Sequence, residues 1–238
     1  MRQIDLILPK IDLTHLGYEL TLSIHSWLMS IIKNDYDPKL QSENELRPFS
    51  MFSRLQKHNI ILRFSLLFDS AAPLYEIFCT AKYINVLGLK EKLSIINKIE
   101  KPQIKVDSLC KPAPNEFKLI IASPATYRHN GRESNMYSLP LLLNTVSEKL
   151  HTFENITISN KEIIEACEQV IYTEYNLHSV NYAIKPNVYR PGFEGELNIR
   201  PRGTNIQRDN LALLLRYAAY TGVGAKTALG MGGIFVFE

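Results

Sequence analysis

The sequence predicts an α+β protein of two tandem domains, and three observations support this prediction. The chain has 238 residues, which suffices for two small cores because domains of about 100 residues are common. Apolar residues alternate with period two in some segments and recur every three or four residues in others, so strands and helices are interleaved. The same order of strands and helices occurs twice along the chain, and Pro112 and Pro114 separate the two runs.

The first unit begins with a strand at residues 3–8. A helix follows at residues 19–32, where Leu20, Ile24 and Leu28 recur at helical spacing. The remaining elements that we expect in this unit are strands at residues 49–52 and 60–68, a helix at 71–87 and a closing strand at 104–110.

The second unit repeats this order with two insertions. We expect strands at residues 117–122, 182–188, 193–199 and 234–237, helices at 139–150 and 210–220, and as insertions a polar loop or hairpin at 123–138 and an amphipathic helix at 160–175. The order βαββαβ defines the ferredoxin-like, or RRM-like, unit. The sequence therefore predicts two ferredoxin-like domains, at residues 1–112 and 113–238, with a glycine-rich loop near the carboxyl terminus.

That loop is the run from Gly222 to Gly233, and the last seventeen residues hold five of the eleven glycines. Glycine lacks the Cβ that keeps a ligand off the backbone, and Lys226 adds a positive charge, so the run favours a phosphate ligand. A P-loop is disfavoured because Ala225 precedes the lysine, and the chain after the run is too short for a dinucleotide-binding unit. The alternative is a turn that only connects the last helix to the last strand.

Composition excludes several other classes. The net charge is +3. Residues 185–238 hold seven Lys+Arg against four Asp+Glu, so the positive excess lies in the part that contains the glycine run. This excess favours an anionic ligand, and the alternative is a basic face that only contacts solvent. The three cysteines form no Cys-x-x-Cys pair, and no short segment has the spacing of a zinc or two-metal site. We expect no metal, no cofactor, no membrane segment and a cytoplasmic location.

Several segments carry a family resemblance. They are Asp37–Leu40, Arg47–Ser50, Ser123–Arg128, Pro191–Leu197, Leu213–Tyr220 and the glycine run. In these segments the chain resembles the CRISPR-associated endoribonucleases of the sixth Cas family, which cut precursor guide RNA. The resemblance implies metal-independent cleavage within a CRISPR repeat, which leaves a 2′,3′-cyclic phosphate and a 5′-hydroxyl. It also implies CRISPR repeat RNA and other Cas proteins as partners, and a monomer or homodimer.

RNA supplies its own nucleophile, so such a protein needs a group that moves the proton of the 2′-hydroxyl and groups that stabilise charge on phosphorus. Among six histidines, His25 lies at the rim of the apolar stripe of the first helix, and a histidine suits proton transfer near neutral pH. The resemblance supports His25 as well. Tyr18, seven residues earlier, is the second catalytic candidate because it shares the face of His25 if the helix extends that far.

The candidate RNA-binding residues are in the glycine run and in the arginine-bearing loop and strand pair of the second domain. They are Gly222, Gly224, Lys226, Thr227, Gly230, Gly232, Arg128, Arg132, Arg190, Arg200 and Arg202. Some family members carry a histidine in the segment that corresponds to residues 41–46, and this chain has none there. Two other functions therefore stay open: a non-catalytic subunit that holds guide RNA, and a nucleotide-binding regulator that uses the glycine loop.

Overall fold

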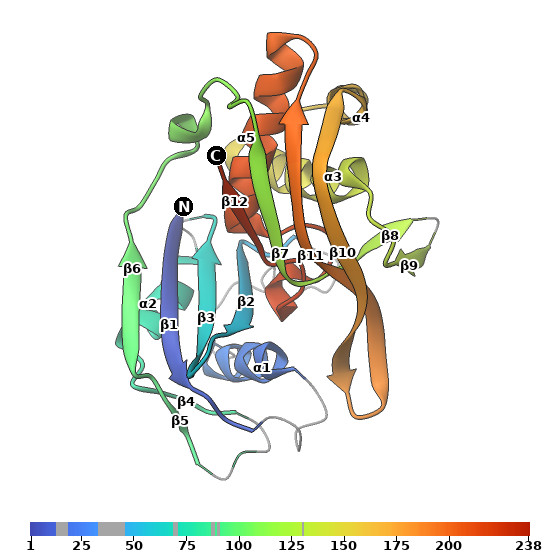
Figure 1. Ribbon diagram of the computed structural model, residues 1–238. Coiled ribbons are helices and arrows are strands. Elements are labelled where there is room, and N and C mark those ends of the chain that lie inside the picture. The colour runs from blue at the N-terminus through green and yellow to red at the C-terminus, as the bar shows by residue number, and fades with distance from the viewer. Residues whose placement is uncertain (13–18, 33–45, 69–70, 87–88, 90, 130) are drawn as a thin grey trace.

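The computed structural model describes residues 1–238 except residues 13–18, 33–45, 69–70, 87–88, 90 and 130. In the described residues, two four-stranded antiparallel sheets form, one from each half of the chain, and helices pack on each (Figure 1). Counted in chain order within its own sheet, the strands of each sheet lie in the order 4-1-3-2. The predicted α+β class and the ferredoxin-like topology of both units are confirmed. The division at residues 112 and 113 stays a prediction.

The first sheet has the order β2-β3-β1-β6. Its strands are β1 (Arg2–Pro9), β2 (Phe49–Leu55), β3 (Asn59–Leu66) and β6 (Asn97–Lys101), and its helices are α1 (Leu20–Ile32) and α2 (Ala72–Thr80). Alternate residues of β1, among them Ile4, Leu6 and Leu8, are fully buried in a core shared with both helices. A short ladder of β4 (Tyr83–Ile84) and β5 (Leu93–Ser94) follows α2.

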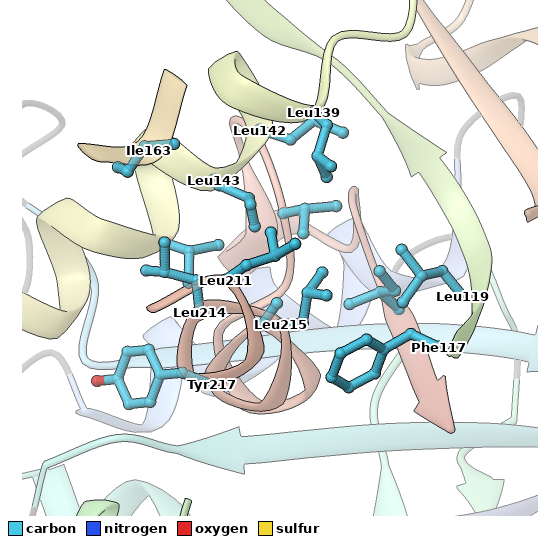
Figure 2. Close-up of a cluster of buried hydrophobic side chains, with 14 of the residues drawn as sticks. Phe117, Leu119, Leu139, Leu142, Leu143, Ile163, Leu211, Leu214, Leu215 and Tyr217 are labelled. Carbon is cyan, nitrogen blue, oxygen red and sulfur yellow. The ribbon is translucent and has the colours of Figure 1, made fainter. Parts of the chain in front are cut away.

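The second sheet has the order β10-β11-β7-β12. Its strands are β7 (Phe117–Ala125), β10 (Val170–Lys185), β11 (Val188–Pro201) and β12 (Ile234–Phe237), and its helices are α3 (Leu139–Glu154), α4 (Asn160–Glu168) and α5 (Asn205–Thr221). Figure 2 shows the core between them, where leucines of α3 and α5 converge on Phe117 and Leu119 of β7. A hairpin of β8 (Tyr127–His129) and β9 (Arg132–Ser134) follows β7, within the predicted insertion.

Capping residues begin two helices of the second unit. Ser159 before α4 and Thr204 before α5 each accept a hydrogen bond from the third residue of the helix, whose side chain bonds back to the cap. Such a capping box satisfies two backbone N–H groups that would otherwise lack partners. These caps place the start of α5 at Asn205, earlier than the predicted residue 210.

Several predicted elements are wrong in extent or place. The strand expected at residues 182–188 is instead the end of β10, a turn at 186–187 and the start of β11. The strand expected at residues 104–110 is instead a 3₁₀ turn, η3 (Val106–Leu109), and the closing strand is β6. β6 is an edge strand with mostly exposed, polar side chains. It is defined by its backbone pairing with β1, and its sequence has no apolar alternation that would predict a strand. The helix expected at residues 71–87 ends at Thr80, and the one expected at 160–175 ends at Glu168, after which the aromatic and β-branched residues join β10.

The two sheets meet through their helix-free faces. The Arg63 guanidinium lies 4.6 Å from the ring centroid of Phe235, and it donates two hydrogen bonds to the Asp5 carboxylate, each 2.7 Å long. Phe52 completes this contact with an edge-to-face arrangement against Phe235. The second domain thus packs on β1, β2 and β3 of the first. Every helix within the described residues is too short or too polar to span a bilayer.

Candidate functional site

A cavity of about 570 Å³ lies between the two domains. Its walls come from α1 and the residues before β2 in the first domain, and from β8, α3 and the glycine-rich loop in the second. The ionisable lining residues are His25, Arg47, Arg128, Glu148, Lys149 and Lys226. Two predicted site residues that are about 200 positions apart in the chain, His25 and Lys226, therefore line one space.

His25 lies on α1 with its ring partly buried and stacked against Phe49, at 6.2 Å between ring centroids. Burial first, and then the nearby Arg47 guanidinium, lower the pKa of His25 to about 4. Among the described residues neither ring nitrogen has a hydrogen-bond partner. At neutral pH the ring is therefore uncharged, and it can accept a proton from a ligand in the cavity.

Positive charge dominates the cavity wall. Arg47, Arg128, Lys149 and Lys226 line it together with one carboxylate, Glu148. Lys226 also lies 3.9 Å from a carboxylate oxygen of Glu133 in the β8–β9 hairpin, which holds its ammonium near the wall. Several cations around one confined space raise its electrostatic potential, so an anion of phosphate size is favoured there.

Lys149 is a residue of this site that the sequence analysis missed. It lies on α3 and is almost fully buried, and its Nζ donates hydrogen bonds to the Thr221 carbonyl at 2.8 Å and to the Thr227 hydroxyl at 2.6 Å. The helical pattern contained a signal, because position 149 continues the stripe of Leu142 and Val146, which are buried. A lysine on an apolar stripe could have been singled out.

The glycine-rich loop packs against protein at most of its glycines. A Cβ on Gly224 would lie 2.1 Å from the Thr126 carbonyl oxygen, and one on Gly232 would lie 1.9 Å from the Val223 oxygen. The loop amides of Ala225 and Gly232 donate to carbonyls of the β7–β8 segment, at 2.7 and 2.9 Å. Close packing against protein therefore excludes a side chain at Gly224 and Gly232, and the role of these glycines toward a ligand stays a prediction. Residues 224–229 line the cavity.

The loop also connects the domains. Its 3₁₀ turn, η4 (Thr227–Leu229), places Ala228 in the hydrophobic core of the first domain. The Tyr182 hydroxyl of β10 donates to the Leu229 carbonyl at 2.6 Å and lies 2.6 Å from the Thr21 hydroxyl of α1. The helix that carries His25 is thus hydrogen-bonded to the same strand that holds the loop.

The other predicted RNA-binding residues lie outside this cavity. Gly222 ends α5 with a positive φ of 66°, and a Cβ on Gly230 would meet Thr21 and Tyr182. Arg190 forms an ion pair of 3.3 Å with Glu133, and exposed Arg132 lies in β9. This places both arginines near the hairpin that holds Lys226.

Arg200 and Arg202 lie at the far end of the second sheet. Phe193 of β11 pairs with Ala125 beside the glycine loop, whereas Ile199 pairs with Phe117 at the opposite end of β7. At about 3.3 Å per residue, these ends are roughly 20 Å apart. Arg200 forms an ion pair of 3.3 Å with Glu116, and Arg202 is exposed. The structure therefore does not bring these two arginines to His25.

Tyr18, the second catalytic candidate, lies outside the described residues, as does the segment 41–45 in which no histidine occurs. In the part of the chain that the structure describes, no group of three or more His, Cys, Asp or Glu side chains is placed to hold a metal ion. A larger hollow of about 770 Å³ is lined by Lys10 and three carboxylates, those of Asp12, Glu19 and Glu194. Its acidic wall suits a phosphodiester less well than the cavity beside His25 does.

Comparison with known proteins shows a similarity to Cas6 endoribonucleases. The family model of the CRISPR-associated endoribonuclease Cas6 matches residues 119–234, just under half of the chain. This region contains β10, β11, most of β7 and the glycine-rich loop. The CRISPR-associated endoribonuclease Cas6 of Streptococcus thermophilus is 25% identical over 251 aligned positions, which cover 100% of this chain and 99% of the relative. The chain is thus similar to Cas6 endoribonucleases.

Solved Cas6 structures have the same fold. A Cas6 product complex superposes with a TM-score of 0.79 at 20% identity and covers 100% of both chains. Cas6 of Thermus thermophilus gives a TM-score of 0.73 at 17% identity, over 99% of this chain and 98% of that one. A Cas6-related protein of Pyrococcus furiosus gives 0.63 at 14% identity, over 100% and 98% of the two chains. At these identities the likeness concerns the tandem ferredoxin-like architecture, which this chain shares over its whole length.

Proposed function

We propose that this protein is a Cas6 endoribonuclease, which cuts precursor CRISPR RNA within the repeat to release guide RNAs. The observation that carries the proposal is the cavity that an uncharged histidine, His25, lines together with the cations Arg47, Arg128 and Lys226 and with Lys149. Proton transfer and anion stabilisation are the two tasks that RNA self-cleavage requires of a protein.

In the proposed reaction, the 2′-oxygen of the ribose attacks the adjacent phosphorus. The bond from phosphorus to the 5′-oxygen of the next nucleotide breaks, which leaves a 2′,3′-cyclic phosphate and a 5′-hydroxyl. Neutral His25 accepts the proton of the attacking hydroxyl, and the bound phosphate raises the pKa of His25 from its low value because opposite charge favours the imidazolium. The leaving oxygen takes a proton from water or from a second side chain, for which the sequence nominates Tyr18.

The cations of the cavity carry the rest of the mechanism. Negative charge grows on the non-bridging oxygens as phosphorus becomes five-coordinate, and donors placed beforehand stabilise it without reorganisation. Arg128 and Lys226 are the side chains we assign to this task, because they line the cavity from the second domain. With this charge supplied by side chains, we propose that cleavage needs no metal ion.

The proposed substrate has support from solved relatives. One is a Cas6 product complex, and another is a Cas6 substrate mimic complex. We propose that repeat RNA is a partner of this protein too. The residues that would contact RNA outside the cavity are Gly222, Gly230, Gly232, Arg132, Arg190, Arg200 and Arg202. Association with other Cas proteins, a monomeric or homodimeric state and a cytoplasmic location belong to the same proposal.

Incubation of the purified protein with its own CRISPR repeat RNA in excess EDTA tests this function. We expect one cut within the repeat, and a 3′ product that polynucleotide kinase can phosphorylate at its 5′-hydroxyl without prior phosphatase treatment. A repeat with a 2′-deoxy sugar at the cut site should bind and stay intact. Cleavage of that deoxy substrate, or cleavage only with added divalent cations, would contradict the proposed chemistry.

A second candidate is a guide-RNA-binding subunit that does not cut. The observation that favours it is the lack of a histidine in residues 41–46, where some family members carry one. The same assay separates the two functions, since a binding subunit would retain repeat RNA tightly and release it uncut.

A further inference from the structure

We propose that the buried ammonium of Lys149 lies at the bottom of an oxyanion-binding site in the cavity beside His25. This site takes one phosphate of the RNA. The inference deepens the proposed function, on which it rests for the identity of the anion. It adds Lys149, a residue of α3, to the groups that contact the RNA.

The geometry of the ammonium group is the first argument. Nζ of Lys149 donates to the carbonyl of Thr221, at the end of α5, and to the hydroxyl of Thr227, in η4. An ammonium has three N–H bonds, and the described residues supply acceptors for two of them. The remaining donor belongs to a side chain that lines the cavity.

The missing counter-charge is the second argument. No carboxylate among the described residues lies within 4.0 Å of Lys149 Nζ, although the residue is only 5% exposed. Buried charges in proteins are nearly always paired, because an isolated ion loses its hydration without compensation. A buried lysine with two hydrogen-bond acceptors but no carboxylate within 4.0 Å, at the wall of a cavity with three further cations, is placed to receive an anion as its third partner.

The state of the site without an anion follows from its neighbours. The titratable and charged groups around the cavity are His25 from α1, Arg47 before β2, Arg128 from β8, Glu148 from α3 and Lys226 from the loop. Burial lowers the pKa of Lys149 to about 7, and Glu148 opposes this shift. An oxyanion in the cavity favours the charged ammonium, so its arrival should raise the pKa of Lys149 and draw a proton into the site.

Titration of lysine side chains labelled with ¹³C at Cε tests the inference directly, with sulfate as a tetrahedral anion that does not itself titrate near neutral pH. The Lys149 signal is assigned by its loss in Lys149→Met, or in Lys149→Arg if the first variant does not fold. At constant ionic strength, we expect its midpoint near pH 7 in chloride and at least one unit higher in sulfate. Lys161, exposed on α4 and assigned through Lys161→Met, serves as the matched control and should not respond.

An equal titration midpoint for Lys149 in chloride and in sulfate would overturn the inference. A Lys149 midpoint close to that of Lys161 in both salts would also overturn it. The repeat-cleavage assay is independent of this result. A protein that cuts repeat RNA while Lys149 ignores sulfate keeps the proposed function and loses this site. A protein whose Lys149 responds to sulfate but which leaves the RNA intact keeps the site and loses the proposed function.

Discussion

At the scale of single residues, burial lowers the pKa of two ionisable groups of the cavity. His25 and Lys149 have pKa values lowered to about 4 and about 7, and desolvation is the largest cause for both. The cavity of the free protein therefore contains fewer charges at pH 7 than its composition implies. Protonation of either group becomes favourable when an anion arrives.

The replacement of His25 by alanine is the first prediction. We expect single-turnover cleavage of repeat RNA to fall by a factor on the order of 10² or more, because proton transfer by a placed side chain contributes that much. RNA affinity should stay within a few-fold, since the arginine and lysine side chains of the cavity remain to contact the phosphates. The rates and affinities are measured with His58→Ala as a matched control in the exposed β2–β3 turn. Equal loss in both variants, or none in His25→Ala, would move the chemistry elsewhere.

The pH dependence of stability is the second prediction. The pKa of His25 is about 4 in the folded protein, below the ordinary 6.5, so the unfolded chain binds more protons between these two values. The free energy of unfolding should therefore rise as pH increases from about 4 to about 6.5, and this part of the rise should vanish in His25→Gln. Urea titrations of both proteins at pH 4.5 and pH 7 measure the effect. A variant as acid-sensitive as the parent would show that His25 is not desolvated.

At the scale of elements, the glycine-rich loop and the β8–β9 hairpin form one wall of the cavity. Gly224 lies against Thr126, and its amide donates to the Thr145 hydroxyl of α3 at 3.0 Å. Lys226 adopts a positive φ of 61° and reaches toward Glu133 of the hairpin. The position of Lys226 therefore depends on how closely the loop approaches its neighbours.

Comparison of two glycines with the same backbone conformation is the third prediction. Gly131 and Gly224 have φ of +75° and +73°, but a Cβ at Gly131 meets nothing within 4 Å, whereas one at Gly224 would lie 2.1 Å from Thr126 O. Gly131→Ala should cost about 1 kcal/mol for the left-handed conformation alone. Gly224→Ala should cost clearly more and should also slow repeat cleavage, because the loop must move away from the cavity wall. Equal losses of unfolding free energy in the two variants would show that the close contact is unimportant.

Salt dependence of RNA binding is the fourth prediction. Arg128 lines the cavity, so Arg128→Ala should flatten the slope of log affinity against log salt by about 0.7 for a single-stranded repeat. The control is Lys161→Ala, which removes one exposed charge on α4. The pair Arg200→Ala and Arg202→Ala tests the far end of the sheet. If that pair flattens the slope and Arg128→Ala does not, the RNA follows β11 and not the cavity.

At the scale of the whole molecule, the site exists only where the domains meet. His25 and Arg47 come from the first half of the chain, and the remaining ionisable wall residues come from the second. Side-chain contacts such as the bond from Ser50 Oγ to the Tyr220 carbonyl, 2.6 Å long, fix the relative position of the two domains. Catalytic geometry should therefore depend on contacts far from the reacting atoms.

The Tyr182 hydroxyl provides the fifth prediction. It lies between Thr21 of α1 and the Leu229 carbonyl of the loop, and Tyr182→Phe leaves both polar groups without this partner. We expect a loss of about 1–3 kcal/mol in unfolding free energy and a lower cleavage rate in the fraction that stays folded. Tyr189→Phe, on the exposed part of the same β10–β11 hairpin, is the control. If Tyr182→Phe lowers the unfolding free energy but leaves the cleavage rate unchanged, this contact has a structural role only.

The fold followed from local patterns to a large extent. The order of strands and helices was predictable because each ferredoxin-like element buries one apolar face, as the leucines of α5 and the alternating residues of β1 do. The edge strands were the exceptions. The extent of β10 and the position of β6 depend on backbone pairing with β11 and β1, and exposed side chains leave no periodic signal of such pairing.

The sequence by itself determined the two-unit α+β architecture, the glycine-rich loop before the last strand and the nomination of His25, because periodicity, glycine content and residue chemistry are local properties. Only the tertiary structure decided which charges share a space with His25. It brought Lys149, Arg128 and Lys226 to the cavity, and it left Arg200 and Arg202 at the other end of the sheet. It also showed the loop glycines packed against carbonyl oxygens. Contacts between distant segments depend on how the two domains pack, and no local pattern records that packing.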